Sequence, residues 1–224
     1  MEFIVNSVLN SITYILPVGS QKDCWLVDCG DIDKIVEQGW HVKGVLLTHA
    51  HFDHIYGLNR FMELFPDAMV FTNAEGKEGL MSPRWNFSRY HDEVDEFIFS
   101  KPENVRVIEG EGWLMLDDGF MVDVMFTPGH DPSCICYHID DCLFTGDSYI
   151  PGMKTITNFP NSVKVQAKAS EERIKDLMAK LGWKICSGHW IEKNKTFKLM
   201  NIPFLSLKDV TALHGAEECS LIIS

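Results

Sequence analysis

The stretch Thr48-His49-Ala50-His51-Phe52-Asp53-His54 decides the fold of this chain. It ends the apolar run Val42–Thr48, which we expect to be a buried strand, and precedes Ile55–Phe65, where apolar residues recur at helical spacing. Side chains alternate along an extended chain, so the first two histidines can face one point, while the turn into the helix brings the aspartate and the last histidine to a neighbouring point. Imidazole and carboxylate groups suit zinc and similar divalent ions, and they are costly to bury unpaired. The stretch therefore predicts a metal site.

Three further candidate ligands follow later strands. In each case an apolar strand leads to a glycine and then to a single ligand-type residue: His130 after Phe120–Phe126, Asp147 after Cys142–Phe144, and His189 after Trp183–Cys186. Glycine lets the backbone turn tightly and approach a site closely. One histidine or aspartate at a strand end is ordinary, but three in this order after the first motif indicate a larger cluster.

Strands are expected in two groups, one in each half of the chain, with helices between and after them. The expected strands are Glu2–Val5, Ile12–Val18, Cys24–Asp28, Val42–Thr48, Met69–Thr72, Val105–Ile108, Phe120–Phe126, Cys134–Ile139, Cys142–Thr145 and Trp183–Cys186, and the expected helices are Asp31–Gln38, Ile55–Phe65 and a helix from Ser162 or Ser170 to Leu181. This order predicts an α/β fold, a four-layer αββα sandwich in which two mixed sheets face each other with helices outside.

The length of 224 residues suits one large domain, and we expect a single domain over residues 1–224. Residues 74–103 mix glycine, proline, aromatic and charged residues, and we interpret them as an irregular cover near the active site; residues 194–224 form a mixed tail that the pattern does not place. Loops often carry specificity. Candidates to line the substrate pocket are Arg84, Trp85, Phe87, Arg89, Tyr90 and Trp190, whereas Trp25, Trp40, Trp113 and Trp183 are expected in the core.

Composition limits the partners. Twenty basic residues against 32 acidic ones give a formal charge of −12, which repels polyphosphates in the absence of a dense basic cluster. We therefore expect a small-molecule substrate, and neither nucleic acid nor a membrane as partner; the composition leaves the oligomeric state open. Seven cysteines without a CxxC pair make a disulfide framework unexpected. With no signal-peptide pattern and no run of eighteen apolar residues, the expected location is the cytoplasm.

In order and kind, these residues resemble the five motifs of the metallo-β-lactamase fold superfamily over about 160 residues. The match begins at Val27-Asp28-Cys29-Gly30 and ends at His189. The resemblance implies that Asp28 supports the ligand loop from outside the metal centre. It also implies the ligand sets, with His49, His51 and His130 on a first ion, Asp53, His54 and His189 on a second, and Asp147 bridging both.

Within the superfamily, the pattern is most similar to hydroxyacylglutathione hydrolases (glyoxalase II-like), lactonases and the phosphodiesterase branch. Asp147 stands where the best-known zinc β-lactamases have cysteine or no bridging ligand, and Phe52 stands where the flavodiiron branch has an acidic ligand. Tyr56 replaces a glycine that usually follows the motif in glyoxalase II proteins, and the Gly-Arg pair that often follows the bridging aspartate is absent. These departures argue against glutathione thioesters as the substrate.

The leading interpretation is a binuclear metal-dependent hydrolase. Two divalent ions, Zn²⁺ by default with Fe or Mn as alternatives, would share a hydroxide that attacks a small carbonyl ester, thioester or lactone. Asp53 and Asp147 would act as catalytic residues by orienting that hydroxide as well as binding metal. The alternatives are a phosphodiesterase or nuclease with the same ligands, and an iron-dependent redox enzyme similar to the persulfide dioxygenases.

Overall fold

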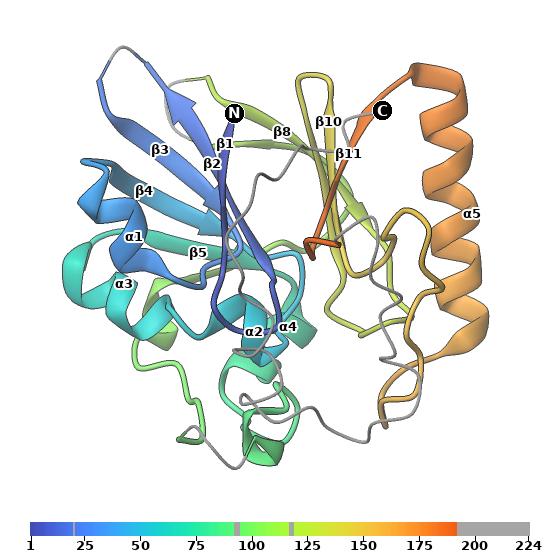
Figure 1. Cartoon of the computed structure of the whole chain (residues 1–224), viewed down its shortest axis with the longest axis horizontal. Helices are drawn as coiled ribbons and strands as arrows, with labels where there is room; N and C mark the ends of the chain where they lie inside the picture. The colour runs from blue at the N-terminus through green and yellow to red at the C-terminus, as the bar shows by residue number, and fades with distance from the viewer. Residues whose placement is uncertain (20, 92–94, 117–118, 192–224) are drawn as a thin grey trace.

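The computed structural model describes residues 1–19, 21–91, 95–116 and 119–191, so the predicted tail at 194–224 lies outside the described residues. Two β-sheets pack face to face, and helices lie on both outer sides (Figure 1). The predicted four-layer αββα arrangement is confirmed. Within the described ranges, no helix is both long enough and apolar enough to cross a membrane.

The six-stranded sheet has the order β1-β2-β3-β4-β5-β6 and is mixed, since β1, β2 and β3 pair antiparallel while β3 to β6 pair parallel. Its strands are β1 (Glu2–Val5), β2 (Ile12–Val18), β3 (Asp23–Val27), β4 (His41–Leu46), β5 (Met69–Thr72) and β6 (Val105–Val107). Helices α1 (Ile32–Glu37) and α3 (Leu58–Leu64) lie on its outer face (Figure 1).

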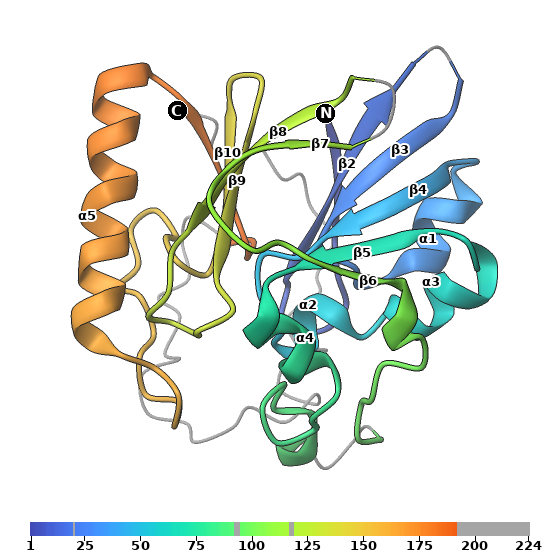
Figure 2. The ribbon, with the colours of Figure 1, turned by 180° about the vertical axis from the view of Figure 1, so that it is seen from behind.

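The five-stranded sheet has the order β11-β10-β9-β8-β7, with β10 and β11 parallel and the other pairs antiparallel. Its strands are β7 (Gly112–Met115), β8 (Met121–Phe126), β9 (Ile135–Ile139), β10 (Cys142–Gly146) and β11 (Lys184–Ser187). Helix α5 (Lys164–Leu181) covers its outer face, as the view from behind also shows (Figure 2). The helix ends at Gly182 in the left-handed conformation, the predicted stop.

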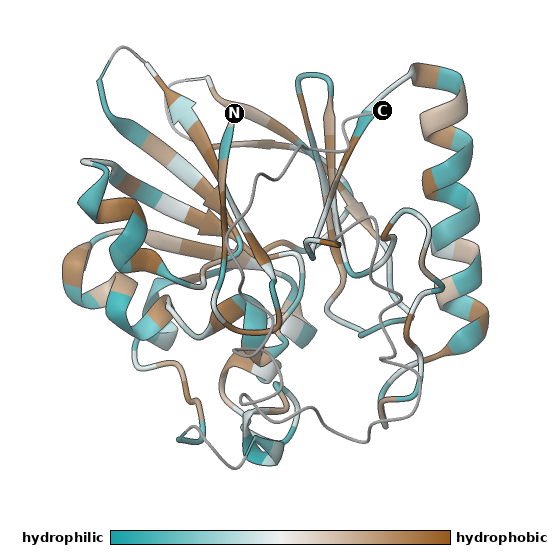
Figure 3. Cartoon of the chain, viewed as in Figure 1, coloured by the Kyte–Doolittle hydropathy of each residue, from teal (hydrophilic) through white to brown (hydrophobic). Residues whose placement is uncertain are grey.

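Apolar side chains fill all three interfaces between the layers. Between the sheets, Leu46 and Tyr14 from one side meet Phe144 from the other. Ile174 of α5 packs against the outer face of the five-stranded sheet beside Leu143. Figure 3 shows the same division, with hydrophobic residues on the strands and hydrophilic ones along much of α5. Because each fully buried aliphatic or aromatic side chain contributes about 1.5–3 kcal/mol, the burial of apolar surface between these layers supplies most of the free energy that stabilises the fold.

Hydrogen bonds join the two sheets close to the end of β4. The Tyr137 hydroxyl of β9 donates to the Leu47 carbonyl at 2.8 Å, and the Ile12 amide of β2 donates to the Gly188 carbonyl at 2.8 Å. Both carbonyls belong to segments that follow a strand and lead into a predicted ligand. The bonds therefore fix the two sets of candidate ligands relative to one another.

The predicted helix Ile55–Phe65 is in fact two helices, α2 (Phe52–Ile55) and α3. Gly57 separates them, and its amide donates to the Cys29 carbonyl at 3.0 Å. A Cβ at this position would lie 1.9 Å from the Gly30 carbonyl oxygen, so the chain passes too close to the β3–α1 turn for a side chain. This close approach, rather than helical periodicity, sets the boundary.

The segment 74–103 is not wholly irregular, because Ala74–Leu80 forms helix α4. The Asn73 side chain accepts a hydrogen bond from the Gly76 amide at 2.8 Å and caps the helix. Two glycines in the helix hid its pattern, since glycine is a poor helix former. The rest of the segment contains short 3₁₀ turns at Ser88–Tyr90 and Pro102–Asn104.

One core prediction is wrong. Trp25 and Trp40 are buried, and Trp183 is partly buried against the apolar cluster beneath α5. Trp113, however, is 67% exposed, because β7 is an edge strand whose alternation turns this residue outward. Each of the six cysteines in the described ranges is a buried free thiol, which agrees with the prediction of no disulfide framework; Cys219 lies outside those ranges.

Candidate metal centre

The first motif forms the connection from β4 into α2 and places its histidines together. The ring centroid of His49 lies 4.5 Å from that of His51 and 4.3 Å from that of His54. His49 and His54 have no exposed surface. The extended backbone before Phe52 and the helical turn after it bring these rings together as the sequence predicted.

The three later candidates reach the same place from the five-stranded sheet. His130 Nε2 lies 3.1 Å from His51 Nδ1, and His189 Nε2 lies 3.3 Å from His54 Nε2. Asp147 follows β10 directly, and its Oδ2 lies 3.2 Å from His189 Nε2. The structure thus brings all seven predicted residues into one cluster.

The cluster divides into two groups that share a middle. Its potential ligand atoms fall in three sets, each within 4.8 Å: His49, His51 and His130; Asp53, His54 and His189; and His49, His54 and Asp147. Asp147 approaches both outer groups, with Oδ1 3.6 Å from His54 Nε2 and Oδ2 3.6 Å from His130 Nε2. This arrangement matches the two positions and the bridging carboxylate that the resemblance implies.

Outer hydrogen bonds aim the histidines. In four of the five rings, Nδ1 faces an oxygen outside the cluster and Nε2 faces inward. The Nδ1 partners are Thr48 Oγ1 for His49 (3.1 Å), Asp28 Oδ2 for His54 (2.8 Å), Ile156 O for His130 (2.8 Å) and Leu9 O for His189 (3.0 Å). A carbonyl or carboxylate oxygen can only accept, and the Thr48 hydroxyl gives its own hydrogen to Asp28, so each Nδ1 carries a proton and Nε2 offers a lone pair when the ring is neutral.

His51 is turned the other way. Its Nε2 lies 3.3 Å from Asp131 Oδ2, so Nδ1 is the atom that faces His130. Since the Ile156 carbonyl holds the proton of His130 on Nδ1, neither of the facing nitrogens carries a hydrogen when both rings are neutral. Two nitrogen lone pairs that face each other at 3.1 Å repel one another unless a cation lies between them.

The donor set fits divalent ions. His49 Nε2 and Asp147 Oδ1 are buried without a hydrogen-bond partner, a loss of about 1–3 kcal/mol each unless something else binds them. Ligand atoms about 2.0–2.1 Å from a tetrahedral ion lie roughly 3.3 Å apart. The inward nitrogen pairs at 3.1 and 3.3 Å match that spacing.

The electrostatics keep the lone pairs of His49 and His130 available. Burial, reinforced by neighbouring imidazoles, lowers the pKa of His49 well below its usual value. Burial and the adjacent His51 lower the pKa of His130 to about 4. Both rings are therefore neutral near pH 7, the state that binds metal.

The carboxylates of the cluster are ionised. Burial acts to raise the pKa of Asp53, but the charge and hydrogen bond of His54 outweigh it and hold that pKa below its usual range. Burial is likewise outweighed at Asp147, whose pKa is lowered by His189. Two anionic carboxylates among histidines are suited to a cationic ligand.

Asp28 supports the motif loop as the resemblance implied. Its Oδ1 accepts from the Thr48 amide and its Oδ2 from the Thr48 hydroxyl, both at 2.8 Å, in addition to the bond with His54. Asp28 itself has φ +60°, a left-handed conformation that aspartate tolerates better than most residues. Such local strain is typical of functional sites.

Asp131 is a residue that the sequence analysis missed. It is 5% exposed and contacts His51, Ser133 and Asn161. The only local signal is an aspartate two residues before a serine, which is ordinary turn chemistry. The partners His51 and Asn161 lie 80 and 30 positions away in the sequence, so the network is visible only after folding.

Gly188 explains why glycine precedes a ligand here. A Cβ at Gly188 would lie 2.3 Å from Asp147 Oδ1 and 2.9 Å from His54 Cε1. The backbone directly after β11 thus passes against two cluster residues, which a side chain would displace.

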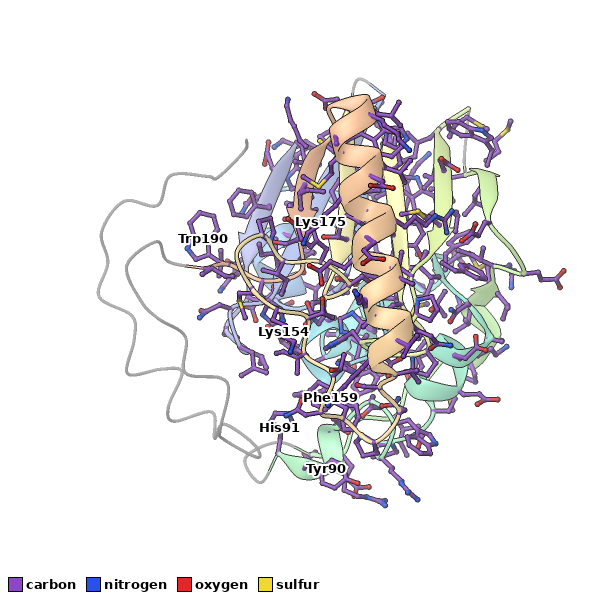
Figure 4. All side chains as sticks on the ribbon, turned by 90° about the vertical axis from the view of Figure 1, so that its right-hand side faces the viewer. Tyr90, His91, Lys154, Phe159, Lys175 and Trp190 are labelled. Atoms are coloured by element: carbon purple, nitrogen blue, oxygen red, sulfur yellow. The ribbon has the colours of Figure 1, made fainter. Side chains whose placement is uncertain are left out.

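Aromatic rings wall the first group. The ring centroids of Phe87 and Phe159 lie 4.8 and 5.0 Å from that of His51 and 4.8 Å from each other. In Figure 4, Phe159 on the connection between β10 and α5 lies near Tyr90 and His91. Trp190, in contrast, stacks on Phe3 with ring centroids 5.8 Å apart. Of the predicted pocket residues, Phe87 therefore has a direct contact with the cluster.

The fold and the site define a class: αββα sandwich proteins with a histidine–aspartate cluster at the edge where the two sheets meet. The chain belongs to the metallo-beta-lactamase superfamily, whose family model matches residues 16–189. The family and the names of its relatives indicate a metal-dependent hydrolase.

Two curated relatives and one solved structure illustrate the similarity. The chain is 29% identical over 135 residues to a hydroxyacylglutathione hydrolase of Hydrogenovibrio crunogenus, covering 58% of this chain and 41% of that protein. It is 33% identical over 140 residues to the probable metallo-hydrolase YqgX of Bacillus subtilis, covering 59% and 64%. The match thus spans less than two thirds of either relative. The BLEG-1 B3 metallo-beta-lactamase shares the fold with a TM-score of 0.74 at 24% identity, over 85% of this chain and 91% of that one.

Proposed function

We propose that the protein is a binuclear metal-dependent hydrolase that cleaves a small carbonyl ester, thioester or lactone. The observation that carries the proposal is the convergence of seven histidine and aspartate side chains, whose potential ligand atoms form three sets within 4.8 Å and include the unpartnered His49 Nε2 and Asp147 Oδ1. A structural metal site needs only four closed ligands, so a seven-residue cluster favours catalysis over a purely structural role.

In this proposal the seven residues bind two ions, in the groups that the distances between their ligand atoms define. The first ion is held by His49, His51 and His130, the second by Asp53, His54 and His189, and Asp147 contacts both. Zn²⁺ is the metal we propose, and Fe or Mn suits the same nitrogen and oxygen donors. When bound, a pair of such ions supplies an acidified water and a Lewis acid for the developing oxyanion.

The chain's own residues orient the reaction. Asp53 Oδ2 and Asp147 Oδ2 lie 3.3 and 3.2 Å from the same atom, His189 Nε2, so the two carboxylates flank one point. Both are ionised and accept hydrogen bonds, and we propose that they orient the attacking water. They are the proposed catalytic residues, and the reaction needs no protein nucleophile.

The surroundings favour a small, partly apolar substrate. The rings of Phe87 and Phe159 form an aromatic wall beside the first group. An acyl or ring substituent of a substrate would gain binding free energy by burying apolar surface against this wall. The charge of −12 disfavours polyphosphates, so we propose a small-molecule substrate and neither nucleic acid nor membrane as partner. We also propose a cytoplasmic location. The hydroxyacylglutathione hydrolase name of a relative supports thioesters as the first substrates to try.

The test combines metal content with a substrate panel. We expect close to two ions per chain, hydrolysis of thioester or lactone substrates, and loss of hydrolysis in His51→Ala and Asp147→Ala. Arg60→Ala, on the exposed surface, is the matched control that keeps both properties. Full activity after metal removal contradicts the proposal. Preferential hydrolysis of bis-nitrophenyl phosphate points instead to the phosphodiesterase branch, and iron with redox-sensitive absorption points to the dioxygenase-like alternative.

A further inference from the structure

Two buried carboxylates lie just outside the seven-residue cluster, and each contacts one of its histidines. Asp28 accepts from His54 Nδ1 at 2.8 Å, and Asp131 faces His51 Nε2 at 3.3 Å. The two histidines belong to different groups, because His51 shares the first group and His54 the second. The carboxylates are therefore counterparts, one for each group of the cluster.

Asp131 is itself held from several directions. Its Oδ1 accepts from both the amide and the hydroxyl of Ser133, and its Oδ2 accepts from the Asn161 amide group. The Ser133 hydroxyl oxygen also accepts from the Ala50 amide at 3.1 Å. Asp131 thus contacts the side chain of His51 and, through Ser133, the backbone of the residue before it.

We propose that Asp131 is a positioning residue that selects Nδ1 of His51 as the atom facing the first metal position. The inference rests on the binuclear centre of the proposed function. It assigns a role to a residue that lies outside the seven cluster residues, contacts His51 and follows His130 in the chain.

The need for such a residue follows from the orientation of His51. The other four rings present Nε2, and each has an oxygen that receives the proton on Nδ1. A histidine can carry its proton on either nitrogen, and the partner of the outer nitrogen decides which one is bare. His51 must place its proton on Nε2, and Asp131 is the acceptor that lies there.

Packing alone does not make this selection. The rings of Phe87 and Phe159 pack against the His51 ring in T-shaped arrangements and restrict its plane, with interplanar angles of 81° and 65°. A half-turn about the Cβ–Cγ bond, however, keeps the ring plane and exchanges nitrogen for carbon on each side. The apolar rings have little preference between those two states, whereas a carboxylate favours the one that offers it an N–H.

The experiment compares Asp131→Asn with Asp28→Asn in the zinc-loaded full chain. Chelator competition measures the affinity of each ion, and long-range ¹H–¹⁵N spectra of the histidine rings report which nitrogen of each ring binds metal. Loss of an outer hydrogen-bond partner lowers metal affinity by roughly 10- to 100-fold. We expect Asp131→Asn to weaken one ion by that factor and to alter the His51 signals, while Asp28→Asn weakens the other ion and alters His54.

Two further variants keep the test sharp. Asn161→Ala leaves the carboxylate in place but removes one of its donors, so we expect a smaller loss of affinity, below about tenfold, with the same His51 signature. Asp141→Asn changes an exposed carboxylate that pairs with Lys184 and is the control that alters neither ion. Thermal unfolding of each metal-free variant separates a folding defect from a change at the site.

The outcomes distinguish the two levels of the argument. If the unmodified protein binds close to two ions, but Asp131→Asn retains both affinities and the original His51 spectrum, the positioning role is wrong and the hydrolase proposal stands. The same holds if Asp131→Asn weakens both ions equally with no change in the His51 tautomer. If the unmodified protein binds no divalent ion, the proposed function itself fails.

Discussion

The two sheets contribute to the cluster in different ways. The six-stranded sheet supplies four residues from a single segment, the end of the β4–α2 connection and the first turn of α2, within positions 49–54. The five-stranded sheet supplies His130, Asp147 and His189, each after a different strand. The first set is positioned by local backbone geometry, whereas the second is positioned only when three strands and two sheets are assembled.

The supporting carboxylates repeat this contrast. Asp28 follows β3 and holds Thr48 and His54, which follow the neighbouring parallel strand β4, so its contacts stay within one sheet. Asp131 belongs to the β8–β9 connection and reaches across to His51. The contacts of Asp28 thus stay within the six-stranded sheet, whereas the contact of Asp131 joins the two sheets.

The largest effect that tests this contrast is expected for Gly188→Ala. The new methyl group would meet Asp147 Oδ1 and His54 Cε1, so a change in the five-stranded sheet displaces ligands from both sets. A misplacement of about 1 Å can cost on the order of 10²-fold in rate. We expect at least that loss in kcat/KM, together with loss of bound metal, measured by steady-state kinetics and metal analysis.

Gly110→Ala is the matched control, because a Cβ at Gly110 meets no atom within 4 Å and its φ is not positive. Kinetics and metal content should match those of the unmodified protein. Equal kinetics and metal content in the two alanine variants would show that the site does not depend on the close approach of Gly188 to Asp147 and His54. The proposed difference between the two sheets would then be contradicted.

The second effect concerns the bonds between the layers. Tyr137→Phe removes the hydroxyl that donates to the Leu47 carbonyl and leaves a buried acceptor unsatisfied, which costs about 1–3 kcal/mol of unfolding free energy. Urea unfolding measures this loss. Tyr149→Phe is the control, since the Tyr149 ring packs toward Lys175 and α5 on the outer side. An unchanged midpoint in Tyr137→Phe would mean that this hydrogen bond does not help to hold the two sheets together.

The contrast also explains how much of the molecule the sequence predicted. The run of ligand-type residues between a buried strand and a helix predicted its own local structure, because strand alternation and the helical turn act over a few residues. The glycine-plus-ligand pattern predicted His130, Asp147 and His189 individually. Their meeting point depended on sheet pairing, which periodicity does not encode, and it was reached through the family resemblance.

What the sequence did not reveal shares one property: the deciding contact is distant in the chain. Asp131 looks like a turn residue until His51 and Asn161 are placed beside it. Trp113 looks like a core residue until β7 is found at the edge of its sheet. Gly57 looks like a tolerated helix residue until the Gly30 carbonyl is found against it.

The smallest effect lies on the outer face of the five-stranded sheet, away from the cluster. Arg173 of α5 binds Glu111 with both guanidinium nitrogens, at 2.7 and 3.0 Å, and this hydrogen bonding holds the pKa of Glu111 below its usual value. A lowered folded-state pKa means that the stabilisation is complete above the unfolded pKa of about 4.3 and is lost as pH falls through the folded value. Both side chains are more than a third exposed, so we expect only about 0.2–1 kcal/mol.

Glu111→Gln tests this expectation, because glutamine keeps an oxygen for the Phe126 amide but loses the charge. The difference in unfolding free energy between Glu111→Gln and the unmodified protein should be full at pH 7 and should be lost as the pH falls below the unfolded pKa of about 4.3 and through the lower folded-state pKa. Metal content and kcat/KM should stay unchanged, because the pair lies on the helix side of the sheet. A change in metal content or in kcat/KM would mean that α5 helps to position the ligands that follow the strands. His130, Asp147 and His189 would then depend on this helix as well as on the six-stranded sheet.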